Sequence, residues 1–120
     1  MANPVVHFEV IGADGARLQR FYGEVFDWKI DTDNPMNYGI VPAADGGIGG
    51  GVAGGEQGRG VTFYIEVPNL EETLAAIEER GGKTLLAPSE VPGGPRLAQF
   101  LDPEGNRIGL VQSRTMPPPT

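Results

Sequence analysis

Polar and hydrophobic residues alternate along several short stretches of the chain, and a period of two is typical of β-strands. In residues 5–10 (VVHFEV), Val6 and Phe8 fall on one face, and His7 and Glu9 fall on the other. We therefore expect a strand with a hydrophobic face and, opposite it, a face that carries a polar pair.

The same alternation returns in residues 60–67 (GVTFYIEV), which are also rich in β-branched and aromatic residues. Thr62, Tyr64 and Glu66 share the face opposite Phe63. This stretch predicts a second strand of the same kind as the first.

Two other stretches follow the helical spacing of three and four residues. Asp14 and Asn69 are suitable N-caps, so we expect helices over residues 15–26 and from residue 70 to the Gly81-Gly82 pair. The apolar stripes of the two helices consist of Leu18, Phe21, Tyr22 and Val25, and of Leu70, Leu74 and Ile77.

The remaining expected strands are shorter or less regular. They are residues 27–30, 37–41, 83–87, 97–101 and 107–112. Between the last two, Asp102-Pro103-Glu104-Gly105 has the composition of a tight turn, because Pro103 presets φ and Gly105 readily adopts a positive φ.

Residues 43–60 contain nine glycines, which are compatible with a flexible linker or with a strand that has one bare face. We favour a strand over residues 47–53, with Ile48 and Val52 anchoring it, followed by a loop.

The order of elements is strand, helix and three strands, and then the same again. It predicts an α+β fold of two βαβββ modules, forming a cupped, partly open mixed β-sheet barrel with the helices outside. We expect a single domain over residues 1–113, with modules at about 4–54 and 60–113, and a loose proline-rich tail at 114–120.

Charge and composition narrow the function. The formal net charge is −7, which disfavours nucleic-acid binding, and no basic cluster or long apolar run points to a membrane. There is no cysteine, which excludes thiolate chemistry and is consistent with a cytoplasmic location.

Five stretches, in this order, resemble the vicinal oxygen chelate superfamily, the group of glyoxalases, bleomycin-resistance proteins and extradiol dioxygenases. They are VVHF (5–8), RFYGEVFDW (20–28), residues 60–69, 77–83 and 100–112, and the resemblance spans residues 4–113. It implies the fold expected above and a small-molecule site inside the cup.

Metal-dependent members of this superfamily place one ligand on each of four strands. The resemblance puts these positions at His7, Gly49, Thr62 and Gly109, of which only His7 matches the family ligand. Because a glycine side chain offers no lone pair, we predict no metal and no other cofactor. The alternative is a divalent metal held by His7 with Glu9 and Glu66.

The cavity face is predicted in two ways. Strand alternation assigns His7, Glu9, Thr62, Tyr64 and Glu66 to it, and the resemblance adds Gly49 and Gly109, whose missing side chains would open volume. Tyr38 and Trp28 are further candidates for the wall, although ordinary core packing would explain Trp28 as well.

The leading functional hypothesis is a small-molecule binding protein with an incomplete metal site, acting as a homodimer. The alternative is a glyoxalase-like lyase or isomerase that uses a divalent metal, or Glu9 or Glu66 as the base. A third hypothesis is a domain whose cup is filled by its own side chains and which acts through protein contacts.

Overall fold

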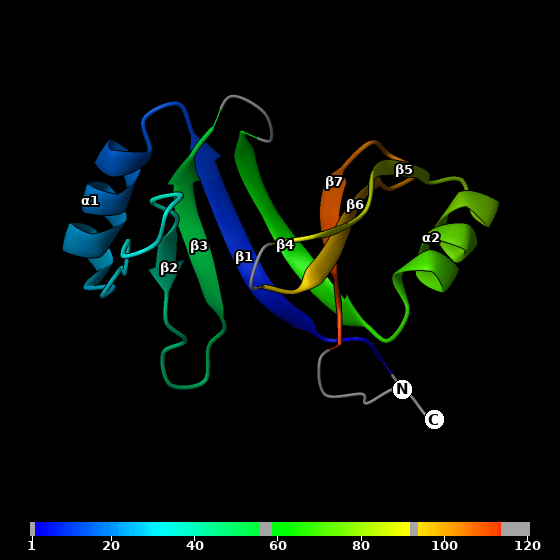
Figure 1. Cartoon of the computed structure of the whole chain (residues 1–120), viewed down its shortest axis with the longest axis horizontal. Coiled ribbons are helices and arrows are strands. Elements are labelled where there is room, and N and C mark those ends of the chain that lie inside the picture. Colours follow the sequence, from blue (N-terminus) through cyan, green and yellow to red (C-terminus); the bar gives the residue numbers. More distant parts are fainter. Residues whose placement is uncertain (1, 56–58, 92–93, 114–120) are drawn as a thin grey trace. The chain divides into compact units, whose positions relative to one another are not determined.

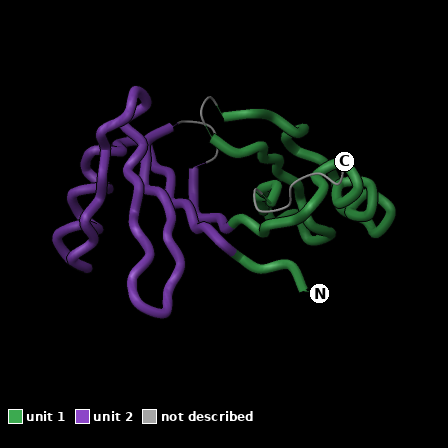
Figure 2. Tube along the Cα trace, turned by 60° about the horizontal axis from the view of Figure 1, so that its bottom comes forward, with its two compact units in different colours: residues 1–5, 64–120 green, residues 6–63 purple. Residues whose placement is uncertain are grey.

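The computed structural model describes residues 2–55, 59–91 and 94–113, and these form two compact units (Figure 2). The first unit is Val6–Phe63, purple and labelled unit 2 in Figure 2, and the second unit, green and labelled unit 1, contains the described residues before Val6 and from Tyr64 onward. The chain passes from one unit to the other inside two strands, after Val5 and after Phe63. The tail at 114–120, which we expected to be loose, lies outside the described residues.

The first unit has a helix on one side of a small mixed sheet (Figure 1). Its elements are β1 (Val5–Gly12), α1 (Gly15–Phe26), β2 (Gly39–Val41), β3 (Gly49–Gly54) and the start of β4 (Gly60–Val67). Strand β3 pairs in parallel with β1 and antiparallel with β2, and α1 lies beside β2 and β3.

Helix α1 begins where the sequence predicts, because the Asp14 carboxylate accepts a hydrogen bond from the Arg17 N–H at 3.0 Å. Half-buried aromatic rings pack beneath the helix: the Trp28 ring centroid lies 5.4 Å from that of Phe8 and 5.5 Å from that of Tyr22. Trp28 therefore packs on the face of β1 opposite His7.

The expected strand over residues 27–30 is wrong. Asp27 ends α1 in the left-handed region with φ 58°, and the Trp28 ring then packs against the ring of Tyr22. The chain becomes extended only at Asp31, which exchanges two 2.9 Å backbone hydrogen bonds with Ile40. Burial of Trp28 against the helix outweighs strand pairing here, so the first module has one strand fewer than expected.

The glycine-rich segment does form a strand, β3, which begins two residues later than predicted. Its bare backbone is needed on both faces, since a Cβ on Gly50 would overlap the ring of Phe8 and one on Gly51 would overlap Tyr38. The interpretation as a glycine strand is confirmed, and the linker alternative is wrong for these residues.

The second unit repeats the pattern with a full complement of strands. After β4 it contains α2 (Leu70–Glu79), β5 (Lys83–Glu90), β6 (Arg96–Leu101) and β7 (Arg107–Gln112). Its strands lie in the order β4-β7-β6-β5, with β4 and β7 parallel and the other pairs antiparallel. The α+β fold class predicted from the sequence is confirmed.

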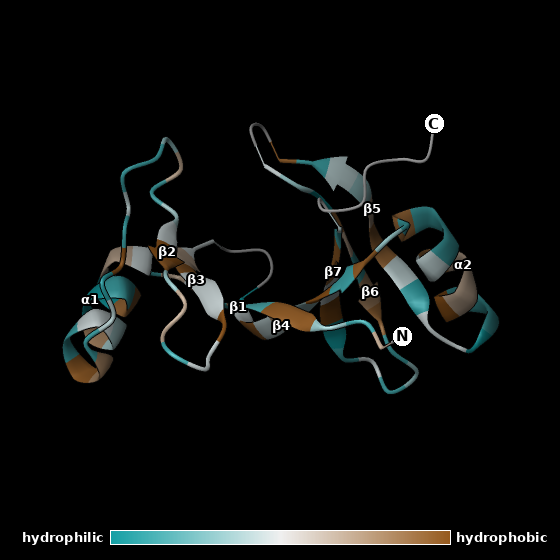
Figure 3. Ribbon diagram, turned by 90° about the horizontal axis from the view of Figure 1, so that it is seen from below, coloured by the Kyte–Doolittle hydropathy of each residue, from teal (hydrophilic) through white to brown (hydrophobic). Residues whose placement is uncertain are grey.

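The core of the second unit lies between α2 and the sheet (Figure 3). Asn69 caps the helix, accepting from the Glu72 N–H at 3.0 Å. The buried core residues are Val67, Leu70, Leu74, Ala98, Phe100 and Leu110. The apolar stripe that the sequence predicts for α2 therefore faces inward.

Strand β5 runs three residues beyond its predicted end, because two register shifts against β6 accommodate Pro88 within it. The turn between β6 and β7 forms as predicted. The Asp102 carboxylate accepts from the backbone N–H groups of Glu104 and Asn106, each at 2.9 Å, and Gly105 has φ 88°.

Candidate functional site

Strand β1 carries the only histidine of the chain, and Glu9 follows it on the same face. The parallel pairing places Gly49 beside His7 and Gly51 beside Glu9 on the neighbouring strand β3. The polar pair predicted from the alternation therefore lies next to a stretch of bare backbone.

Tyr38 occupies the space above that backbone. It comes from the loop that precedes β2, and its hydroxyl reaches across Gly51 to the polar pair. The Tyr38 Oη atom lies 2.9 Å from Nε2 of His7 and donates to Oε2 of Glu9 at 2.9 Å. The rings of His7 and Tyr38 are nearly parallel, at an angle of 14°. We call His7, Tyr38 and Glu9 the polar trio.

The environment of the trio affects how His7 ionises. Burial lowers the pKa of His7 below its usual value, and the nearby Glu9 carboxylate opposes that shift without cancelling it. A neutral imidazole is therefore favoured near neutral pH, and the formal charge of the trio comes from Glu9 when its carboxyl group is ionised.

The structure brings three of the predicted site residues together in the first unit, namely His7, Glu9 and Tyr38, and Gly49 flanks them. Thr62 belongs to the same unit. It is buried, and its hydroxyl donates to the Phe63 carbonyl at 3.4 Å.

The other predicted site residues, Tyr64, Glu66 and Gly109, belong to the second unit. Tyr64 and Gly109 are register partners of β4 and β7, and a Cβ on Gly109 would overlap the ring of Tyr64. The expectation that Gly109 opens volume is therefore wrong, because Tyr64 fills that space. Glu66 follows Tyr64 on the same face of β4.

Sequence reasoning missed two residues that shape the trio. Gly51 lies two positions after Gly49, so strand alternation assigns it to the same face. The family resemblance places a ligand position at Gly49 and none at Gly51. Asn34 precedes Pro35 and holds the loop that carries Tyr38 through its side chain. An asparagine before a proline is a recognisable turn signal.

The residues at the four family ligand positions do not supply that family's donor set. Nε2 of His7 is hydrogen-bonded to Tyr38, and Gly49 and Gly109 have no donor atom. In the part of the chain that the structure describes, no group of three or more histidine, cysteine, aspartate or glutamate residues is arranged to hold a metal ion.

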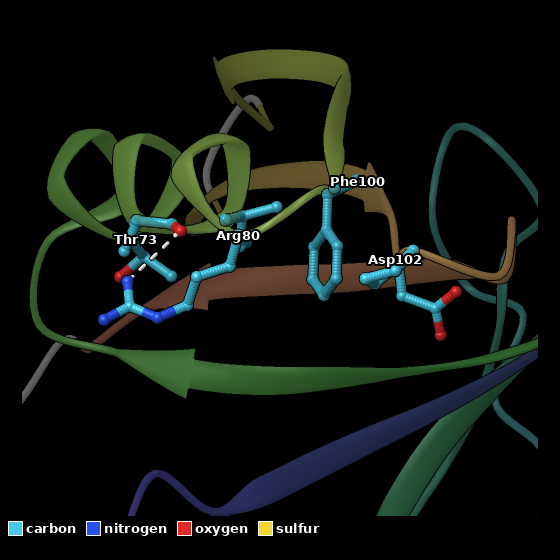
Figure 4. A pocket seen from close by; sticks show the side chains of 8 residues that line it. Thr73, Arg80, Phe100 and Asp102 are labelled. Atoms are coloured by element: carbon cyan, nitrogen blue, oxygen red, sulfur yellow. Dashed lines mark hydrogen bonds between the residues drawn. The ribbon is translucent and has the colours of Figure 1, made fainter.

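Two open surface hollows lie elsewhere, one in each unit. The hollow in the second unit lies between α2 and the turn after β6, where the ring of Phe100 points between Arg80 and Asp102 (Figure 4). The hollow in the first unit lies at the start of α1 and includes Arg17 and Arg59. Neither is lined by a predicted site residue.

Comparison with known proteins assigns the class. The model of the glyoxalase-like domain family matches residues 7–111. A glyoxylase-like domain-containing protein from Didymella fabae is 35% identical over 114 residues, covering 82% of this chain and 84% of that relative.

Solved structures show the same fold. A glyoxalase/bleomycin resistance protein/dioxygenase superfamily member from Vibrio splendidus 12B01 has a TM-score of 0.66 at 21% identity, covering 93% of this chain and 100% of that one. A methylmalonyl-CoA epimerase variant from Streptomyces coelicolor, in complex with 2-nitronate-propionyl-CoA, has a TM-score of 0.67 at 17% identity, covering 99% and 100%.

The fold is thus that of the vicinal oxygen chelate superfamily, as the sequence resemblance predicted. Within it, the chain belongs to the glyoxalase-like domain family. Neither helix is long and apolar enough to cross a membrane, as judged on the described residues.

Proposed function

We propose that this chain is a small-molecule binding protein of the glyoxalase and bleomycin-resistance type that works without a resident metal or other cofactor. The observation that carries the proposal is the contact of the Tyr38 hydroxyl with both His7 and Glu9, each at 2.9 Å. Because the Tyr38 hydroxyl lies against Nε2 of the one imidazole of the chain, a metal could reach that nitrogen only by displacing Tyr38.

The charge of the trio favours cationic or hydrogen-bond-donating ligands over anionic ones. A neutral imidazole beside a carboxylate favours ligands that are cationic or rich in hydrogen-bond donors, and the net charge of −7 acts in the same direction. An anionic ligand such as an acyl-CoA would approach against this charge. We therefore propose a cationic or neutral organic ligand that donates hydrogen bonds to Glu9.

Calorimetry and thermal-shift measurements on protein treated with a chelator test this proposal. Bleomycin and spermidine serve as cationic probes, and methylmalonyl-CoA serves as an anionic one. We expect stabilisation by a cationic probe without added metal, and loss of that stabilisation in Glu9→Gln. The proposal fails if purified protein holds a stoichiometric metal that binding requires.

A second candidate function is a lyase or isomerase in which a carboxylate abstracts a proton. The hydrogen bond from the Tyr38 hydroxyl to Glu9 favours it, because a fixed donor holds the carboxylate of a base in one orientation. Methylmalonyl-CoA epimerase, which shares the fold, is an isomerase. Glu66, in the second unit, is the other candidate base.

Hydrogen–deuterium exchange at an activated C–H bond tests the enzymatic candidate. Turnover that persists after chelation and disappears in Glu9→Gln or Glu66→Gln would identify the base. If a divalent metal held by His7 is needed for the reaction instead, His7→Ala should lose metal and turnover together. Unchanged activity in that variant would refute the metal-dependent mechanism.

We also propose a cytoplasmic homodimer as the working form. The exposed apolar side chains of Val5, Val61 and Ile40 support self-association, since a second copy would bury them. Light scattering over a range of concentrations gives the oligomeric state. A monomer at every concentration would refute the dimer.

A further inference from the structure

We propose that Asn34 is a positioning residue of the candidate site: acting through Tyr38, it holds His7 in the tautomer that carries its proton on Nε2. This inference rests on the proposed function, because it assigns Asn34 a role in the candidate binding site. Asn34 bonds the backbone of Tyr38.

The donors and acceptors of the polar trio fix the direction of its hydrogen bonds. A tyrosine hydroxyl has one proton to donate, and an ionised carboxylate only accepts. The Tyr38 proton is directed at Oε2 of Glu9, so the 2.9 Å contact between Tyr38 Oη and His7 Nε2 is filled by an imidazole N–H donating to the phenol oxygen. The hydrogen bonds therefore run in one direction, from His7 through Tyr38 to Glu9.

Tyr38 lies outside the strands, and Asn34 holds it in place. The side chain of Asn34 bonds both backbone polar groups of Tyr38: its Oδ1 accepts from the Tyr38 N–H at 2.9 Å, and its Nδ2 donates to the Tyr38 carbonyl at 2.8 Å. The same Oδ1 also accepts from the Met36 N–H at 3.2 Å. One amide thus closes the loop over residues 34–38.

The loop has two further restraints. Asn37 has φ 52°, so the chain reverses in the left-handed region just before Tyr38. Gln19 on α1 donates to the carbonyl oxygens of Asn37 at 3.0 Å and Val52 at 2.8 Å, which ties the loop to β3. The ring of Tyr38 is then held directly above Gly51.

Nitrogen-15 NMR of the imidazole, on protein without an affinity tag and without any ligand, tests the inference. The chain has a single histidine, so its two ring nitrogens need no separate assignment among residues. In the wild type above the pKa of His7, we expect the proton on Nε2. Tyr38→Phe, which removes the acceptor, should shift the two nitrogen signals toward a mixture of tautomers.

Asn34→Ala should produce the same shift in part, because the phenol remains but its anchor is lost. Asn34→Asp keeps the acceptor for the N–H groups of Met36 and Tyr38, so we expect it to restore most of the wild-type spectrum. Unchanged signals in Asn34→Ala, or no recovery in Asn34→Asp, would overturn the role of Asn34. Unchanged signals in Tyr38→Phe would overturn the directed chain of hydrogen bonds.

Asn69→Ala is the matched control, since it also removes an asparagine that caps backbone N–H groups, but in the second unit. It should leave the His7 signals unchanged, and a shift equal to that of Asn34→Ala would overturn the inference. Fluorescence of Trp28, the only tryptophan, checks that each variant is folded. Because no ligand is present, the tautomer result stands or falls separately from the binding proposal.

Discussion

The ring of Tyr64 covers Gly109 on the adjacent strand, and its hydroxyl accepts a hydrogen bond from Nε2 of Gln99 at 3.2 Å. The first unit has a similar arrangement, in which Tyr38 covers Gly51 and reaches a polar residue on the far side. Both glycines lie on the last strand of their module. In each unit a glycine thus makes room for a tyrosine whose hydroxyl crosses the strand.

Gly109→Ala should destabilise the protein by about 1–3 kcal/mol, because the new methyl group overlaps the Tyr64 ring and forces it to move. Chemical denaturation measures the loss. Gly47→Ala is the control, since the nearest atom to its added Cβ would be 3.6 Å away. Equal losses in the two variants would show that the ring does not depend on the glycine at position 109.

The parts of the fold predicted correctly depend on local chemistry. The Asp14 and Asn69 caps and the turn at Asp102 need only neighbouring residues, and each forms as expected. The prediction of a strand at residues 27–30 was wrong, because the same residues also allow Trp28 to pack beneath α1. Tertiary burial decides between these outcomes, and periodicity does not report it.

The candidate site was predictable to a similar degree. Alternation along β1 correctly placed His7 and Glu9 on one face, as their shared contact with Tyr38 shows. The position of Tyr38 depends on a loop held by the Asn34 side chain, and on the absence of a side chain at Gly51. Neither is encoded in a repeating pattern, so the trio could not be assembled from the sequence.

Leu70→Ala should cost about 2–5 kcal/mol, because Leu70 is fully buried in the core of the second unit and its removal leaves a cavity. Leu85→Ala is the matched control on β5, where the side chain is 49% exposed, and its effect should stay within about 0.5 kcal/mol. Urea denaturation of both variants gives the comparison. A loss at Leu70 as small as that at Leu85 would contradict the assigned core.

Asp102 should make stability fall in acid. The Asn106 side chain and the backbone N–H groups of the turn hydrogen-bond its carboxylate and hold its pKa below the usual value. A carboxyl group whose pKa is lowered by folding stabilises the folded state above its unfolded pKa, and this contribution is lost as the pH falls through the folded pKa. Asp102→Asn should therefore reduce the slope of stability against pH below about pH 4. An unchanged slope would show that the turn does not favour the ionised form.

His7 should produce a second dependence on pH, at less acidic values. Its folded pKa lies below the unfolded value of 6.5 because burial disfavours the imidazolium. Between these two pKa values the unfolded chain binds more protons, so stability is complete above pH 6.5 and falls as the pH drops toward the folded pKa. Thermal unfolding between about pH 7 and pH 5 measures this fall, and His7→Gln, which keeps a polar group but cannot titrate, should flatten it. If the wild-type protein instead became more stable as the pH fell, the effect of the Glu9 carboxylate on the pKa of His7 would outweigh that of burial, and the imidazole in the trio would be charged.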